Sequence, residues 1–288
     1  MFIRKYQSTI LGALFLIAGV VWIFVFKESA QGEFLKINFL DVGQGDAIFI
    51  ETMNKKQMLI DGGPDLSVLE KLGKIIPFYD RYIDLVLLTH PEQDHLNGLI
   101  EVIKRYDVGA IITTGIIRDT SQYQEWIKII KQKNIPIYIA EVGGVVDFRN
   151  NINLNILYPF ENMNNKKLAD SNNYSIVSKL NYNNFDLLLT GDIEKSVENK
   201  LIKAKTDLDA DILKVAHHGS KTSTSENFLK AVNAIMAIIE VGKDNRYGHP
   251  HQEVVERLKN LDIFQTGKDG SIEILTNGQK IITTTSIF

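Results

Sequence analysis

The sequence predicts an α/β domain in which helices cover sheet faces, preceded by a hydrophobic N-terminal segment. Short apolar runs typical of strands alternate with amphipathic helical patterns in both halves of the chain. The composition is globular, with 44% hydrophobic and 23% charged residues among 288. An uncharged apolar stretch lies between basic residues close to the N-terminus. Together these patterns indicate a layered α/β fold and a membrane segment.

The predicted strands outnumber the predicted helices. Most are short apolar runs bounded by Gly or Asn, and Asn277-Gly278 is typical of a hairpin turn. The predicted strands are Phe34–Phe39, Ala47–Glu51, Gln57–Ile60, Ile83–Thr89, Gly109–Thr113, Pro136–Ala140, Ile152–Tyr158, Ser175–Tyr182, Phe185–Thr190, Ile212–Ala216, Ala234–Val241, Asp262–Phe264, Ile272–Thr276 and Gln279–Thr284.

Helical spacing of apolar residues marks the segments between these strands. Ser225 precedes one such segment and suits the N-cap position of a helix. The predicted helices are Leu66–Ile76, Leu96–Tyr106, Ser121–Lys133, Val197–Ala204, Glu226–Val232 and Gln252–Lys259.

Composition also excludes several kinds of site. The chain has no cysteine, so disulfides, thiolate metal sites and cysteine nucleophiles are excluded, and any metal must be held by His, Asp or Glu. The first thirty residues hold three basic residues and one acidic residue, so the remainder carries 29 basic against 34 acidic residues. This balance disfavours a broad basic surface that grips nucleic acid, although a local basic track stays open.

The segment from Thr9 to Phe26 predicts one transmembrane helix. It contains 18 residues without a charge and is flanked by Arg4, Lys5 and Lys27. A cleaved signal peptide is the alternative, but the residues that follow lack a good small-x-small cleavage site. We therefore expect a membrane anchor in residues 1–30 and a catalytic domain in residues 31–288. The basic flanks place the domain outside the cell.

All six histidines fall in three short segments that follow apolar strands. The segments are His90-Pro-Glu92-Gln-Asp94-His95, His217-His218-Gly-Ser220 and His249-Pro-His251. Two further carboxylates, Asp61 and Asp192, end strands of their own. Loops at strand ends are where open sheets carry functional groups. One alternative is that these residues are helix caps and surface groups, but their repetition at several strand ends favours one shared site.

Imidazole and carboxylate ligands suit Zn, Mn or Fe. In an extended turn His90 and Glu92 would face one ion, while Asp94 and His95 would face a neighbouring ion. Asp192 could bridge the two ions and His217 could complete the second site. Such a pair of ions activates water and neutralises a phosphodiester oxyanion.

Several motifs resemble a known family. THPEQDHLNG resembles the His-x-His-x-Asp-His signature of the metallo-β-lactamase fold, and LIDGG and LLLTGD resemble its first and bridging-Asp motifs. FLDVGQGDAIFIE, ILKVAHHGS and NRYGHPH narrow the resemblance to the C-terminal hydrolase domain of the ComEC/Rec2 competence proteins. The resemblance covers roughly residues 34–284. It implies an αββα sandwich and a metal-dependent hydrolase.

The resemblance also implies roles for individual residues. Asp61 would orient a ligand histidine from outside the coordination shell. The metal ligands it implies are His90, Asp94, His95, Asp192 and His217, with Asp94, Asp192 and His217 also counted as catalytic. Residues that would line the site for an anionic substrate are His218, Ser220, Tyr247 and His249.

Two positions depart from the signature. Glu92 replaces its second histidine, which keeps a metal-ligand type but favours harder metals such as Mn. The separate ligand histidine expected near residues 171–175 is absent, and an Asn such as Asn172 is a weak ligand. The expected cofactor is therefore Zn or Mn, as one ion or two.

We expect a membrane-anchored hydrolase of phosphodiester bonds, with DNA as the substrate that the resemblance favours. One alternative is an extracellular phosphodiesterase acting on a cell-surface polymer or phosphorylcholine head groups. Another is a weakly active or inactive module that binds nucleic acid or a partner beside the membrane. With one hydrophobic span, this chain is not itself expected to form a DNA channel.

Overall fold

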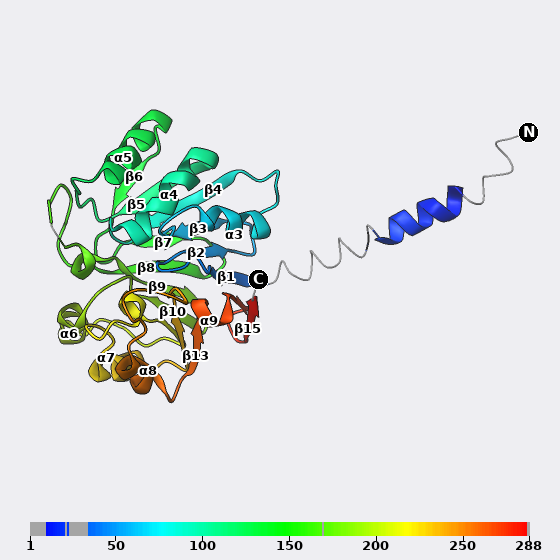
Figure 1. Ribbon diagram of the computed structural model, residues 1–288. Helices are drawn as coiled ribbons and strands as arrows, with labels where there is room; N and C mark the ends of the chain where they lie inside the picture. The colour runs from blue at the N-terminus through cyan, green and yellow to red at the C-terminus, as the bar shows by residue number, and fades with distance from the viewer. Residues whose placement is uncertain (1–9, 21, 23–33, 169, 287–288) are drawn as a thin grey trace, which may run out of the picture. The chain divides into compact units, whose positions relative to one another are not determined.

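The computed structural model describes residues 10–20, 22, 34–168 and 170–286 (Figure 1). The chain divides into two units, residues 1–34 and residues 35–288. The second unit holds all the strands named below and every residue predicted for the site.

In the first unit, residues 10–20 are helical. The predicted transmembrane span, residues 9–26, lies partly outside the described residues. Among the residues that are described, no helix is both long enough and apolar enough to cross a bilayer. The transmembrane helix therefore stays a prediction from the sequence.

The second unit contains two β-sheets. The first has eight strands, parallel from β3 to β6 and antiparallel elsewhere. Its order is β15 (Ile281–Ser286), β14 (Ser271–Thr276), β1 (Leu35–Phe39), β2 (Ile48–Glu51), β3 (Gln57–Ile60), β4 (Tyr82–Leu88), β5 (Asp107–Thr113) and β6 (Ile137–Ile139).

The other sheet has seven strands, parallel from β10 to β13 and antiparallel from β7 to β10. Its order is β13 (Asp262–Gln265), β12 (Met236–Ile239), β11 (Ile212–Lys214), β10 (Phe185–Leu189), β9 (Val177–Tyr182), β8 (Ile152–Tyr158) and β7 (Val145–Asp147).

Three hydrophobic clusters define four layers. One lies between the sheets and includes Phe39, Leu87 and Leu187. A second packs the outer face of the eight-stranded sheet against α3 (Ser67–Ile75), α4 (Gln93–Arg105) and α5 (Ser121–Lys133). A third packs the other sheet against α6 (Lys195–Lys203), α7 (Glu226–Val232) and α8 (Gln252–Leu258). Figure 1 shows these helix groups on opposite sides of the sheets, which is the predicted αββα sandwich.

Many predicted elements are confirmed. Helices α5 and α7 and strand β8 have the predicted bounds, the Ser225 side chain caps α7, and β14 and β15 form a hairpin. Strand β7 and helix α9 (Thr266–Asp269) were not predicted.

One boundary matters for the site. Helix α4 begins at Gln93, three residues before the predicted start. Asp94 and His95 therefore lie in the first helical turn, whereas the predicted helix began only at Leu96. The amphipathic pattern begins only at Leu96, so hydrophobic spacing alone could not show the earlier start.

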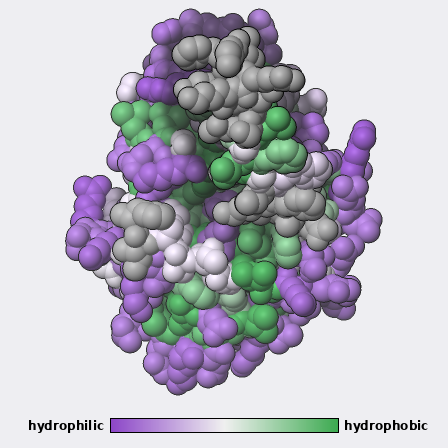
Figure 2. Space-filling view, turned by 90° about the vertical axis from the view of Figure 1, so that its right-hand side faces the viewer, coloured by the Kyte–Doolittle hydropathy of each residue, from purple (hydrophilic) through white to green (hydrophobic). Residues whose placement is uncertain are grey.

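The surface mixes polar and apolar residues. Figure 2 shows hydrophilic residues around the outline of the face in view, with hydrophobic patches between them. Exposed large apolar side chains include Phe78 and Tyr79 in the connection from α3 to β4. Scattered exposed apolar residues are normal on soluble domains.

Candidate metal centre

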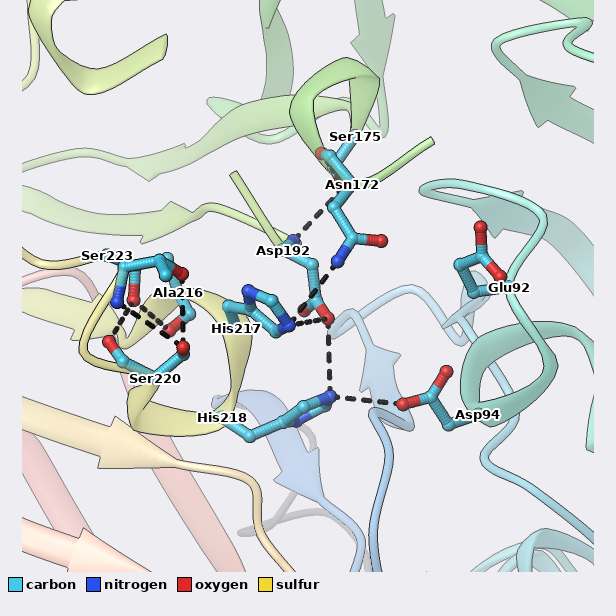
Figure 3. Close-up of polar contacts among 12 residues, drawn as sticks. Glu92, Asp94, Asn172, Ser175, Asp192, Ala216, His217, His218, Ser220 and Ser223 are labelled. Carbon is cyan, nitrogen blue, oxygen red and sulfur yellow. Dashed lines mark hydrogen bonds and ion pairs between the residues drawn. The ribbon is translucent and has the colours of Figure 1, made fainter. Parts of the chain in front are cut away.

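Four side chains converge at the carboxyl ends of strands from both sheets. Asp94, His95, Asp192 and His218 could together hold a metal ion, because one donor atom from each lies within 4.8 Å of the others. Asp192 Oδ2 is 3.4 Å from His95 Nε2 and 3.3 Å from His218 Nε2. His218 Nε2 is 3.4 Å from Asp94 Oδ2 (Figure 3). Ligands about 2.1 Å from a tetrahedral zinc lie roughly 3.4 Å apart, so these distances suit one ion.

The start of α4 positions Asp94 and His95. The helix follows β4 after a short turn, and its first turns pack closely against the loop after β3. The N–H of Gly62 donates to the carbonyl of His95 at 2.8 Å, and the N–H of Gly98 donates to the carbonyl of Gly63 at 3.0 Å. A Cβ at Gly98 would collide with the Gly62 backbone. Glycine here allows the helix to approach the sheet edge and fixes its two ligands.

Asp61 orients His95. The Nδ1 of His95 lies 2.8 Å from Asp61 Oδ2, and the Thr89 amide and hydroxyl donate to the same carboxylate at 2.8 and 2.6 Å. A proton on Nδ1 directed at Asp61 leaves the Nε2 lone pair facing the cluster. Asp61 is fully buried and has a left-handed backbone with φ of 55°. The structure therefore places Asp61 as the resemblance implies.

His218 is oriented from the opposite sheet. Its Nδ1 lies 2.9 Å from the carbonyl of Glu240, at the end of β12, and 3.2 Å from Asp46 Oδ1. His217 and His218 both have left-handed backbones, with φ of 50° and 52°. This tight turn sends the adjacent rings in different directions, and it is His218 that enters the cluster. Strained backbone of this kind is common at functional sites.

Asp192 ends the segment after β10. Its amide donates to the Ser175 hydroxyl at 3.1 Å, and Gly191, with φ of 51°, lets the chain turn beside Ser175. One carboxylate oxygen, Oδ2, faces both ligand histidines, whereas Oδ1 has no hydrogen-bond partner.

A buried charge network lies beneath the ligands. Lys214, the last residue of β11, forms an ion pair with Asp46, and both are almost fully buried. The backbone amide of Ala47 donates to Glu240 Oε1 at 2.9 Å. A second group of donors, made of Asp46, Asp61 and His95, lies nearby, but the Lys214 ammonium already supplies its positive charge. We therefore assign no ion to that second group.

The electrostatics of the cluster favour a cation. Burial would lower the pKa of His95, but Asp192, Asp61 and Asp94 raise that pKa well above its usual value. Burial also acts against protonated His218, yet Asp192 and Asp46 raise the pKa of His218. The Nε2 atoms of both rings are buried without hydrogen-bond partners. Concentrated negative charge beside unpartnered imidazole nitrogens fits a divalent cation.

Three residues of the cluster, Asp94, Asp192 and His218, line a cavity of about 320 Å³, whereas His95 is fully buried. Four carboxylates line this cavity, with imidazole, amide and phenol groups among them. The lining residues are Gln44, Glu92, Asp94, Asp170, Asn172, Asp192, His217, His218, Tyr247 and His249. A larger cavity of about 790 Å³ contains none of the predicted site residues.

Several predicted ligands lie outside the cluster. His217 Nε2 is 3.9 Å from Asp192 Oδ2 and 3.3 Å from Asn172 Nδ2, so His217 lies beside the cluster while His218 takes the position expected for it. Glu92 lies on the cavity wall but contacts other residues. His90 is fully buried, its ring lies 4.2 Å from that of His95, and burial, reinforced by His95, lowers its pKa to about 3.

The residues predicted to line a substrate site are placed differently from one another. Tyr247 and His249 line the cavity, with their rings stacked at a centroid distance of 5.8 Å. Ser220 is buried, its hydroxyl bonds to that of Thr222 at 3.0 Å, and it is not among the lining residues.

Sequence patterns did not reveal the charge network below the site, nor the roles of Arg118 and Ser171 beside it. Lys214 and Glu240 interrupt or end apolar strand segments, ILKVA and AIIE, and a charged residue in such a run signals a buried partner. Asp46 follows a Gly-Gln-Gly turn. Arg118 and Ser171 carry no comparable signal, because each lies in an irregular connection.

Fold and site agree with one family. The chain matches the metallo-β-lactamase superfamily over residues 40–234 and belongs to that superfamily, whose members are generally metal-dependent hydrolases. The metallo-β-lactamase fold protein YhfI from Bacillus subtilis shares the fold, with a TM-score of 0.52 at 12% identity, covering 81% of this chain and 98% of that one.

Within the superfamily, the relatives include competence proteins, as the motifs predicted. ComE operon protein 3 of Bacillus subtilis (strain 168) is 30% identical over 265 residues, covering 85% of this chain and 33% of that protein. Recombination protein 2 of Haemophilus influenzae is 31% identical over 244 residues, covering 82% of this chain and 28% of that protein. The chain thus spans a third or less of the length of these relatives.

Proposed function

We propose that this protein is a metal-dependent hydrolase of phosphodiester bonds, with DNA as its substrate. The observation that carries the proposal is the convergence of Asp94, His95, Asp192 and His218, three of which line a cavity. The similarity to competence proteins favours DNA over other phosphodiesters.

The four clustered residues would hold a divalent ion, Zn or Mn. A bound ion of this kind would act as a Lewis acid and would lower the pKa of a bound water towards neutrality. The protein's own contribution is orientation, because Asp61 fixes the ring of His95 and the Glu240 carbonyl fixes the ring of His218. Both bonds hold a proton on Nδ1 and keep Nε2 available.

Charge explains why the cation is needed. The cavity wall carries the carboxylates of Glu92, Asp94, Asp170 and Asp192, which repel a phosphodiester. His249 adds no charge at neutral pH, because burial, together with His218 and His217, lowers its pKa to about 4. A neutral imidazole retains one N–H donor, and Tyr247 adds a hydroxyl, so both can bind phosphate oxygens.

The test is hydrolysis by the purified full chain with Mn or Zn, using plasmid DNA and bis-p-nitrophenyl phosphate. We expect both to be cleaved. If the small ester is cleaved and DNA is not, the substrate is another phosphodiester, such as a surface polymer or a phosphorylcholine head group. If neither is cleaved and metal does not change the melting temperature, the remaining function is that of an inactive binding module.

We predict that Asp192→Asn abolishes metal-dependent hydrolysis while the domain stays folded, because the amide keeps the shape but loses the charge facing both histidines. Circular dichroism would verify folding and metal titration would verify lost binding. Asp262→Asn is the matched control, since Asp262 is exposed at the start of β13. Full turnover in the Asp192 variant would refute the ligand assignment.

A second part of the proposal is attachment to the cell membrane through residues 9–26, with the catalytic domain outside the cell. The support is the uncharged apolar sequence and its basic flanks. Because the chain has no cysteine, single cysteines at Ser8 and Ser29 would each be the only thiol.

We expect an impermeant maleimide to label the Ser29→Cys variant on intact cells and the Ser8→Cys variant only after lysis. Release of the protein by carbonate extraction would contradict membrane insertion. Labelling at both positions on intact cells would contradict the proposed orientation.

A further inference from the structure

Glu92 lies on the wall of the cavity, yet both of its carboxylate oxygens are engaged away from the cluster. Oε2 accepts from Arg118 Nη2 at 3.1 Å, and Oε1 accepts from the Ser171 hydroxyl at 2.7 Å. Figure 3 shows Asp94 joined to His218, whereas no interaction joins Glu92 to the other residues drawn. A carboxylate held by a guanidinium and a hydroxyl has its lone pairs directed at those donors.

The two groups that hold Glu92 are themselves fixed. Arg118 also donates from Nη1 to the carbonyl of Leu168 at 2.7 Å, and its side chain is 17% exposed. Ser171 is fully buried, immediately before the 3₁₀ turn Asn172–Tyr174. Glu92 would have to break its bonds to both Arg118 and Ser171 in order to turn inward.

Without Glu92, a second ion beside the first would depend on His90, Asp192 and His217, and His217 Nε2 already faces the Asn172 amide nitrogen at 3.3 Å. His90 Nε2 and Asp192 Oδ1 are buried without partners and could contribute two donors. Asn172 presents its amide nitrogen to His217 at 3.3 Å, and an amide nitrogen has no lone pair for a metal. Catalytic zinc sites generally have three protein ligands, so the position of Glu92 decides whether a second site exists.

We propose that Arg118 and Ser171 hold Glu92 out of coordination, and that the chain binds one divalent ion, at Asp94, His95, Asp192 and His218. This inference rests on the proposed function, because it assumes that the four-residue cluster binds metal. It assigns Arg118 and Ser171 as positioning residues that set the metal stoichiometry.

The test is a titration of the metal-free full chain with Mn²⁺ alone. Calorimetry measures the number of ions bound, and electron paramagnetic resonance shows whether bound ions interact with one another. We expect one ion per chain and the spectrum of an isolated Mn²⁺. Two ions with an exchange-coupled spectrum in the unaltered protein would overturn this inference and leave the proposed metal centre intact. No bound ion would overturn both, so the two failures are distinguishable.

Two variants release the constraint by different routes. Arg118→Met with Ser171→Ala removes both partners of Glu92, and Glu92→His restores an imidazole that Arg118 does not hold. We expect each to bind two ions per chain with a coupled spectrum, since paired ions lie about 3.5–4 Å apart. Adding Glu92→Gln to the first variant should return the stoichiometry to one.

Arg105→Met is the matched control, because Arg105 pairs with Glu101 on the exposed face of α4. It should still bind one ion. If the double variant and Glu92→His are both folded and still bind one ion, the proposal is overturned.

Discussion

At the residue scale, the contacts of each polar side chain decide which residues enter the candidate metal centre. The sequence indicated Asp94, His95 and Asp192 from their types and spacing, and Asp61 from its motif. It could not separate His217 from His218, because two left-handed residues in succession decide which ring points inward. It also could not show that Arg118, some 26 positions away, takes up Glu92. Such pairings depend on tertiary contacts that no local pattern encodes.

The buried pair of Lys214 and Asp46 gives a prediction about stability. Lys214→Met leaves the buried carboxylate of Asp46 without its ion-pair partner, and we expect a loss of roughly 3–5 kcal/mol in the free energy of unfolding. Adding Asp46→Asn should recover most of that loss. Urea unfolding with a chelator present would measure both. A single Lys214→Met variant as stable as the unaltered protein would contradict this account of the network.

Tyr158 gives a prediction about alkaline pH. Burial raises the pKa of Tyr158 to about 12, and its hydroxyl donates to the Asn173 carbonyl at 3.0 Å. Since the unfolded chain ionises near pH 10, the stabilising contribution is complete below pH 10 and is lost as pH rises towards 12. Tyr158→Phe should lower the free energy of unfolding by about 1 kcal/mol at pH 8. Above pH 10, the free energy of unfolding of this variant should fall less steeply with pH than that of the unaltered protein. Urea midpoints from pH 8 to 11 would show parallel curves if this assignment were wrong.

At the element scale, long periodic segments were predictable and contact-dependent boundaries were not. Helices α5 and α7 follow from apolar spacing and capping, and their bounds were predicted correctly. The start of α4 depends instead on the contact of Gly98 and His95 with the loop after β3. The ends of elements near the site are therefore set by packing rather than by propensity.

Two glycines in helices should respond oppositely to alanine. A Cβ at Gly98 would meet the Gly62 backbone, so Gly98→Ala should cost about 1–3 kcal/mol and weaken metal binding by displacing His95. A Cβ at Gly73 in α3 meets nothing within 4 Å, so Gly73→Ala should stabilise by about 0.5–1 kcal/mol. Thermal unfolding with and without metal would compare them. Equal effects would show that the close approach of α4 is unimportant.

At the scale of the whole molecule, the centre joins the two sheets. Asp94 and His95 follow β4 of the eight-stranded sheet, whereas Asp192 and His218 follow β10 and β11 of the other. The alternation of strands and helices predicted the layers, because each apolar face needs a cover. The assignment of strands to two separate sheets came only with the resemblance and the structure.

Metal should therefore stabilise the folded domain as a unit. At a free ion concentration 100 times the dissociation constant, binding adds about 2.7 kcal/mol to the free energy of unfolding. We expect a higher melting temperature with Mn and slower amide exchange at the ends of both β4 and β10. The Asp192→Asn variant should show neither effect. Protection confined to one sheet would contradict a site shared by both.

The equal division of ligands has a consequence for severed chains. The connection from β8 to the 3₁₀ turn at Asn172 separates Asp94 and His95 from Asp192 and His218 along the chain. A protein cut there would leave each fragment with half of a coordination sphere. Tight uptake of one ion would then report that the two fragments had recombined in the native arrangement, which would make the cation a sensor of fragment complementation.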